Sequence, residues 1–162
     1  MTIDSETFKA GMRQLAAGVT VVTSALNGER SGLTATSVCS VSADPPTLLV
    51  CVNRHSRSNT MIAAAGCFAV NVLGADDEAL SNRFASSSES EDRFRGHRWL
   101  ALESGAPILE DALAAFDCRV VQQIEQGSHT IFIGSVVAAR PGDGHAAPLL
   151  YMRGGYGSFS GE

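Results

Sequence analysis

Short apolar runs separated by turn-forming residues make up most of the chain. The clearest run, residues 47–53, follows the chain break Pro45-Pro46 and predicts a buried strand. Asn27-Gly28 is typical of a tight turn, so the β-rich segments on either side of it are expected to pair antiparallel. The predicted strands are residues 19–26, 32–36, 47–53, 67–73, 115–126, 130–139 and 149–151.

Three stretches have helical features. A first helix is capped by Asp4 or Ser5 and stops before Gly18, where the next strand begins. A second is predicted over 58–65 and a third over about 76–84, whose first turn is acidic. The apolar face expected for the first helix consists of Phe8, Met12, Leu15 and Ala16.

Many antiparallel strands and a few short helices predict a mainly β fold, a closed or partly closed barrel. The chain has no internal repeat, so residues 1–162 are interpreted as a single domain, large enough for a core of its own. The serine- and glutamate-rich segment 86–91 is the only biased stretch. It predicts a mobile loop, either a functional one or a solvated linker.

Composition narrows the classes of partner. A net charge of -5 argues against nucleic acid and against anionic membranes. The 44% hydrophobic and 18% charged content excludes disorder and leaves apolar surface for a second copy of the chain. The polar, acidic start shows no signal peptide, so a cytoplasmic location is expected. The four cysteines have no metal-ligand spacing, which predicts reduced thiols and no metal site.

Two neighbouring segments suggest the chemistry. Small and hydroxyl-bearing residues fill 34–42, where backbone N–H groups can lie close to a flat polar ligand. The strand 47–53 runs into a cluster of hydrogen-bond donors, 53–59, of the kind that can hold a phosphate. A planar ring at the first segment and its phosphate at the second would describe a bound flavin. Helix-cradled phosphate motifs and the nucleophile elbow of hydrolases are absent from the sequence.

A set of motifs strengthens this interpretation through their order and spacing. In chain order the motifs are residues 34–42, Pro45-Pro46, residues 49–54, Arg83-Phe84, Asp92-Arg93-Phe94, Gly127-Ser128-His129 and residues 151–156. With these motifs the chain resembles, from Phe8 to Tyr156, the flavin reductase family that supplies reduced flavin to two-component monooxygenases. That family includes the reductase component of 4-hydroxyphenylacetate hydroxylase and the flavin reductase of pyrimidine catabolism.

The resemblance implies a fold and an activity. The fold would be an FMN-binding split β-barrel that dimerises, with the site near the subunit interface. The activity would be that of an NAD(P)H:flavin oxidoreductase, which passes hydride from NADH (or NADPH) to FMN or FAD and releases the reduced flavin to a flavin-dependent monooxygenase by diffusion. Because the cofactors carry this chemistry, no protein acid or base is required.

The resemblance also implies the site residues. Backbone groups of residues 36–38 would bond the flavin ring, and Asn53, Ser56 and Ser58 its phosphate end. His129 would be the catalytic residue that orients the nicotinamide. Arg83 would reach the phosphate side, although Ser86 stands where relatives commonly have glycine. The expected cofactor-binding residues are Thr34, Ala35, Thr36, Ser37, Val38, Cys39, Ser40, Asn53, Ser56, Ser58, Asn59, Arg83, Tyr151, Arg153 and Tyr156.

Other interpretations stay open from the residues alone. His129 can be an ordinary turn histidine, and Tyr151, Arg153 and Tyr156 can be packing residues rather than a stacking surface for adenine or nicotinamide. At the level of function, the alternatives are an oxidase or electron carrier that retains its flavin, a non-catalytic flavin-binding module, and a structural protein without a ligand.

Overall fold

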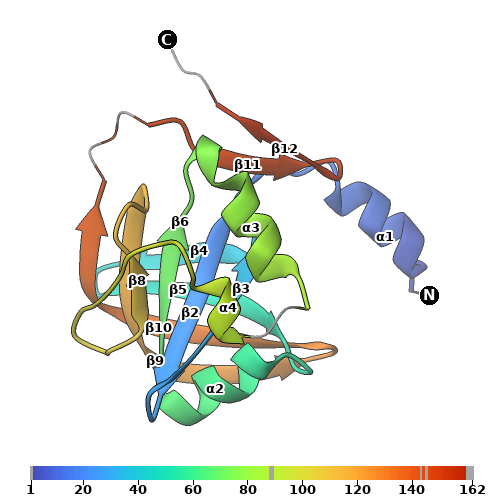
Figure 1. The fold of residues 1–162 in the computed structure, drawn as a ribbon. Coiled ribbons are helices and arrows are strands. Elements are labelled where there is room, and N and C mark those ends of the chain that lie inside the picture. Colours follow the sequence, from blue (N-terminus) through green and yellow to red (C-terminus); the bar gives the residue numbers. More distant parts are fainter. Residues whose placement is uncertain (1, 88–89, 143, 145, 160–162) are drawn as a thin grey trace.

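A seven-stranded antiparallel sheet forms the body of the protein in the computed structural model, which describes residues 2–87, 90–142, 144 and 146–159. The strand order is β3-β2-β6-β9-β10-β5-β4, and the sheet is strongly curved (Figure 1). The strands of this sheet are β2 (Thr20–Leu26), β3 (Glu29–Ala35), β4 (Val38–Ala43), β5 (Pro46–Asn53), β6 (Cys67–Val72), β9 (Ala114–Gln126) and β10 (His129–Pro141).

Two smaller sheets complete the fold. One joins β1 and the hairpin β11–β12, and the other is the hairpin β7–β8. The mainly β fold with short helices is confirmed, and the sheets stay open rather than closing into a full barrel. The strands of the small sheets are β1 (Ala17–Gly18), β11 (Leu149–Met152), β12 (Gly155–Ser158), β7 (Trp99–Ala101) and β8 (Pro107–Leu109).

The predicted turns and caps are confirmed. Asn27 and Gly28 both have positive φ, 52° and 83°, as a two-residue hairpin requires, and they join β2 to β3. The second helix begins after Ser56, whose side chain accepts the Asn59 N–H, and Gly66 ends it in the left-handed region. The helices are α1 (Ser5–Met12), α2 (Arg57–Ala65), the 3-10 turn η1 (Ala75–Asp77), α3 (Glu78–Ala85) and α4 (Ser90–Arg93).

The core lies on the concave face of the large sheet. Phe68 of β6 and Phe132 of β10 are fully buried there, and Val50 and Val52 of β5 pack with them. A second cluster under α3 centres on Phe84 and Phe94. Among the described residues, no helix has the length and apolar character needed to cross a membrane.

Helix α1 differs from the prediction. Asp4 caps it as expected, but it ends at Met12, and Leu15 lies beyond it. None of its residues is buried, and it extends away from the sheet beside the β11–β12 hairpin (Figure 1). Its apolar face therefore contributes nothing to the core of the protomer.

Two further elements differ as well. Strand β5 alternates between a buried and a half-exposed face, so it is not buried on both faces. The predicted loop 86–91 includes the start of α4, where Ser90 Oγ donates to the Arg30 carbonyl oxygen at 2.7 Å and Glu91 pairs with the Arg30 guanidinium at 2.6 Å. Ser88 and Glu89, in the same predicted loop, lie outside the described residues.

Candidate functional site

The small-residue stretch forms the corner between β3 and β4. At its start Thr34 Oγ1 donates to the Ser81 carbonyl oxygen of α3 at 2.5 Å. Ala35 is buried in the core, and its carbonyl oxygen accepts the Thr20 hydroxyl at 2.7 Å. Thr36 and Ser37, which lie between the two strands, are exposed. The first two residues of the predicted stretch are thus structural contacts of the corner.

Thr36 and Ser37 carry backbone donors that the fold does not use. The Ser37 carbonyl oxygen accepts the Cys51 N–H at 3.0 Å. The N–H groups of Thr36 and Ser37 make no hydrogen bond to any other described residue. Backbone N–H groups that the fold leaves unused can donate to the carbonyl and ring nitrogen acceptors of a flat heterocycle.

His129 lies on the same face of the sheet as Cys51 and Asn53. Successive side chains of a strand point to opposite faces, and Val50 and Val52 point into the core, so Cys51 and Asn53 point outward. The register pairs His129 of β10 with Asn53 of β5. Ser37 lies beside Cys51, two residues along β5 from Asn53, which pairs with His129. Two strand spacings of about 4.8 Å across the sheet and two residues along it therefore separate His129 from the Ser37 corner by roughly 12 Å.

The His129 ring is oriented by its neighbour. Ser128 Oγ lies 2.9 Å from His129 Nδ1 at the exposed end of the β9–β10 hairpin. This contact holds one edge of the imidazole against the turn. The sequence motif therefore becomes a positioned ring beside Asn53.

The turn from β5 into α2 uses several of the predicted phosphate ligands internally. Asn53 Oδ1 accepts the His55 N–H at 2.9 Å, and Ser56 caps α2. Asn59 Nδ2 donates to the Val52 carbonyl oxygen at 3.1 Å. Ser58 is buried, and its hydroxyl lies 2.8 Å from the Ser31 hydroxyl of β3. Ser58 thus faces the sheet, whereas Asn53 is exposed. Ser56 is half-buried, and its hydroxyl donates to the Asn53 carbonyl oxygen at 2.8 Å.

Two arginines flank this turn. Arg54 pairs with Glu125 at 2.9 Å and Arg57 with Glu29 at 2.7 Å. Both pairs are exposed to solvent, where an ion pair contributes little stability and a phosphate can compete for the cation.

The β11–β12 hairpin brings three predicted residues to the other side of Thr36. The rings of Tyr151 and Tyr156 form an edge-to-face pair with centroids 5.3 Å apart. Tyr156 donates its hydroxyl to Asn82 Oδ1 at 3.0 Å. Arg153 has a φ of 54° in the two-residue turn and donates from Nε to Gln14 Oε1 at 2.9 Å.

Two adjoining clefts meet at Tyr151. The first, of about 410 Å³, lies under α3 and includes Thr34, Asn82 and Tyr156 in its lining. The second, of about 520 Å³, lies between α1 and the β11–β12 turn. Both are lined by Thr36, Tyr151 and Gly154, and the second also by Ser37. The tertiary fold thus adds Asn82 and α1 to the site, neither of which carries a motif in the sequence.

Arg83 lies apart from these groups. It lies in the last turn of α3 and donates from Nη1 to the Arg95 carbonyl oxygen at 2.5 Å. It does not line either of the two clefts, among the residues described. In this structure the Arg83 side chain connects α3 to Arg95, in the segment that follows α4.

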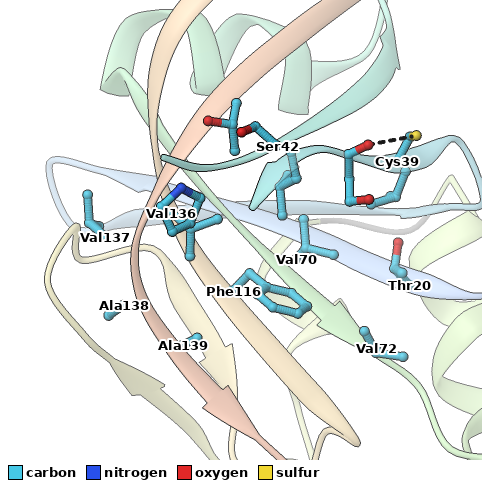
Figure 2. Close-up of a pocket in the computed structure, with 15 residues that line it drawn as sticks. Thr20, Cys39, Ser42, Val70, Val72, Phe116, Val136, Val137, Ala138 and Ala139 are labelled. Atoms are coloured by element: carbon cyan, nitrogen blue, oxygen red, sulfur yellow. Dashed lines mark hydrogen bonds between the residues drawn. The ribbon is translucent and has the colours of Figure 1, made fainter. Parts of the chain in front are cut away.

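Val38, Cys39 and Ser40 line a different cavity, which is open to solvent. Figure 2 shows this cavity, whose walls include Val70, Phe116 and Val136. Its volume is about 510 Å³, and no charged side chain is among its described lining residues. It therefore suits an apolar ring and offers no cation to a phosphate.

Two cysteine thiols of the sheet have raised pKa values. Burial raises the pKa of the Cys51 thiol, and burial together with the Asp117 charge raises that of Cys118 to about 12. Both thiols are therefore protonated at neutral pH and are poor nucleophiles. No cluster of three or more His, Cys, Asp or Glu side chains able to hold a metal occurs in the described part of the chain.

Comparisons with known proteins agree with one another. The family described as Flavin reductase like domain matches residues 12–160. The chain is 42% identical over 151 residues to the FMN reductase (NADH) RutF of Ancylobacter novellus, covering 93% of this chain and 83% of that protein.

Solved structures share the fold over nearly the whole chain. Nitrilotriacetate monooxygenase component B from Mycobacterium thermoresistibile superimposes with a TM-score of 0.90 at 34% identity, covering 97% of this chain and 87% of that one. The Streptomyces globisporus C-1027 NADH:FAD oxidoreductase SgcE6 has a TM-score of 0.90 at 32% identity, covering 99% and 98%.

Proposed function

Because the chain belongs to the flavin reductase like domain family, we propose that it uses NADH to reduce free FMN or FAD and releases the reduced flavin to a partner monooxygenase. The relatives named above reduce FMN or FAD with NADH, and one is a component of a monooxygenase. This chain covers most of the length of each of them.

The observation that carries the proposal is the exposed strip from Thr36 to His129. The strip consists of the Thr36 and Ser37 corner, whose N–H groups the fold does not use, the outward-facing Asn53 and the oriented imidazole of His129. A flat ring can lie along such a strip with its polar edge on the N–H groups and its phosphate towards Ser56. Asn53 and Ser56, beside Arg54 and Arg57, would receive that phosphate.

The chain's own task in this function is positioning. The bound cofactors supply the redox chemistry, which is hydride transfer from nicotinamide to flavin. Thr36 and Ser37 would orient the flavin ring through their N–H groups, and His129 would hold the nicotinamide over it. Bringing two free molecules together in the correct orientation costs entropy, and this cost is a large part of the barrier to hydride transfer. A protein that already holds the two rings in contact has removed that cost before the reaction step.

A spectroscopic assay tests this function. When purified protein is mixed with NADH and FMN, or with NADH and FAD, the absorbance of the reduced nicotinamide should fall steadily as NADH is oxidised. Protein that retains one flavin per chain and reduces no added flavin would support the alternative of a flavin-retaining oxidase or carrier. Protein that neither binds flavin nor oxidises NADH contradicts the proposal.

His129→Ala should raise the KM for NADH or slow flavin reduction several-fold, with little change in flavin affinity. The effect is partial because hydride transfer needs no proton from the imidazole, and only its positioning contact is lost. The measurement is steady-state kinetics with NADH varied, together with flavin titration. His97→Ala serves as the matched control, and kinetics equal to those of the wild type in both variants would remove His129 from the site.

The exposed apolar residues support a homodimer. Val121 is 62% exposed and Ile124 38% exposed, and both lie on β9, so they leave apolar surface uncovered in the protomer. A self-complementary two-fold interface would cover it and would lie next to the His129 strip. A site completed there can open to release flavin on each turnover.

Light scattering and a dialysis experiment test assembly and delivery together. We expect twice the chain mass. We also expect a flavin-dependent monooxygenase behind a dialysis membrane to hydroxylate more slowly but still measurably when oxygen is kept low. A strict monomer contradicts the dimer, and complete loss of hydroxylation across the membrane contradicts diffusive delivery.

A further inference from the structure

The cleft between α1 and the β11–β12 turn is held open by specific contacts. The Arg153 N–H donates to the Arg13 carbonyl oxygen at 3.0 Å, and Arg153 Nε donates to Gln14 Oε1 at 2.9 Å. These bonds fix the end of α1 against the turn, as Figure 1 shows for the two elements. The α1 wall of the cleft carries Phe8 and Met12. The cleft of about 520 Å³ is therefore a feature of the folded chain.

The charge of this cleft is entirely positive among its described lining residues. Lys9, Arg13 and Arg153 line it, and no Asp or Glu does. Lys9 Nζ is bonded to Glu6 at 2.9 Å, and Arg153 Nε is occupied by Gln14. The Arg13 guanidinium has no hydrogen bond or ion pair with any described side chain or backbone group. In a protein of net charge -5, an uncommitted cation in an apolar cleft is an anion-binding feature.

The cleft continues into the proposed reaction site. Thr36 and Ser37, whose N–H groups are unused, form its inner wall. On the opposite side, Tyr151 separates it from the neighbouring cleft under α3. A ligand whose reacting ring lies on Thr36 and Ser37 can therefore extend a charged and partly aromatic portion towards Arg13.

We infer that this cleft binds the adenosine diphosphate portion of a dinucleotide, with Arg13 bonding the diphosphate and the apolar side chains of α1 lying along the adenosine. Guanidinium matches phosphate oxygens in a bidentate geometry, and an adenine ring packs on apolar and aromatic surface. This inference rests on the proposed function, because NADH and FAD both carry that portion and FMN lacks it.

The direct test is binding of ADP itself, measured by isothermal titration calorimetry in low salt. Arg13→Gln should weaken ADP binding about tenfold, and Arg13→Lys should restore part of it. Arg98→Gln is the matched control, because Arg98 is an exposed arginine that does not line the cleft. Since the side chains of Arg13 and Arg98 are both exposed, the thermal midpoint should be the same in all variants. Equal ADP affinity in the wild type and Arg13→Gln overturns the inference.

Two further comparisons, one of KM values and one of flavin affinities, identify which dinucleotide binds in the cleft. With FMN as acceptor, Arg13→Gln should raise the KM for NADH about tenfold and leave that for reduced nicotinamide mononucleotide unchanged if NADH occupies it. If FAD occupies it, the variant should weaken FAD binding and spare FMN. Equal changes for each pair overturn the inference.

The outcomes separate the two claims. If the protein binds ADP through Arg13 but oxidises no NADH, the proposed function is contradicted and ADP binding in the cleft is still supported. If the Arg13→Gln protein reduces flavin with an unchanged KM for NADH and an unchanged affinity for FAD, the proposed function is supported and the ADP-binding role of the cleft is contradicted.

Discussion

Ser37→Leu is expected to weaken flavin binding about 30-fold while leaving the fold intact. Ser37 lies in the corner between β3 and β4, exposed and without a core contact, so its side chain contributes little to stability. A leucine there would occupy the space through which a flat ring reaches the Thr36 and Ser37 N–H groups. Forcing extra methylenes into a fitted contact costs about 1–3 kcal/mol, and a loss of 2 kcal/mol corresponds to roughly 30-fold in affinity.

The measurement is flavin fluorescence quenching for FMN and FAD, with thermal unfolding in parallel. Ser158→Leu is the matched control, because Ser158 is also exposed but lies on β12, outside both clefts. Unchanged flavin affinity in a stably folded Ser37→Leu protein would remove this corner from the binding site. A loss of affinity in the control as large as that of Ser37→Leu would show that the effect is not local.

Gly134→Ala is expected to lower the free energy of unfolding by about 2–3 kcal/mol through overpacking. Gly134 lies on the concave face of β10, where a Cβ atom would come within 2.6 Å of Phe68 Cζ and 2.9 Å of Cys118 Cβ. Phe68 and Cys118 are completely buried, so neither can move aside without disturbing the core. The strand itself is held between β9 and β5.

Urea denaturation of the wild type and two glycine variants measures this effect. Gly157→Ala on β12 is the matched control, since nothing lies within 4 Å of a Cβ added there. The control should be close to neutral, because the reduced entropy of the unfolded chain offsets small costs. A Gly134→Ala protein as stable as the control would mean that the core around Phe68 is less tightly packed than the structure shows.

Local patterns account for most of the secondary structure. The Asn27-Gly28 turn, the Ser56 cap and the Gly66 end of α2 depend on backbone conformations that the residues themselves favour, so the sequence predicts them well. The β7–β8 hairpin and β12 were not predicted. They are three- and four-residue strands whose pairing depends on neighbours far along the chain, and such short runs carry little periodicity.

The candidate site, like the secondary structure, was predicted from the sequence only in part. The sequence by itself determined that Thr36, Ser37, Asn53 and His129 lie at the ends of strands and carry hydrogen-bond donors suited to a flavin and a nicotinamide. It also determined that the chain resembles the flavin reductase family along nearly its whole length. Only the tertiary structure decided which of the predicted donors are free, because a side chain's bonds depend on what packs against it. Ser58 and Arg83 are bonded inside the fold, whereas the Thr36 and Ser37 N–H groups are left exposed. The cleft beside Arg13 exists only because α1 packs beside the distant β11–β12 turn, a juxtaposition that no local pattern encodes.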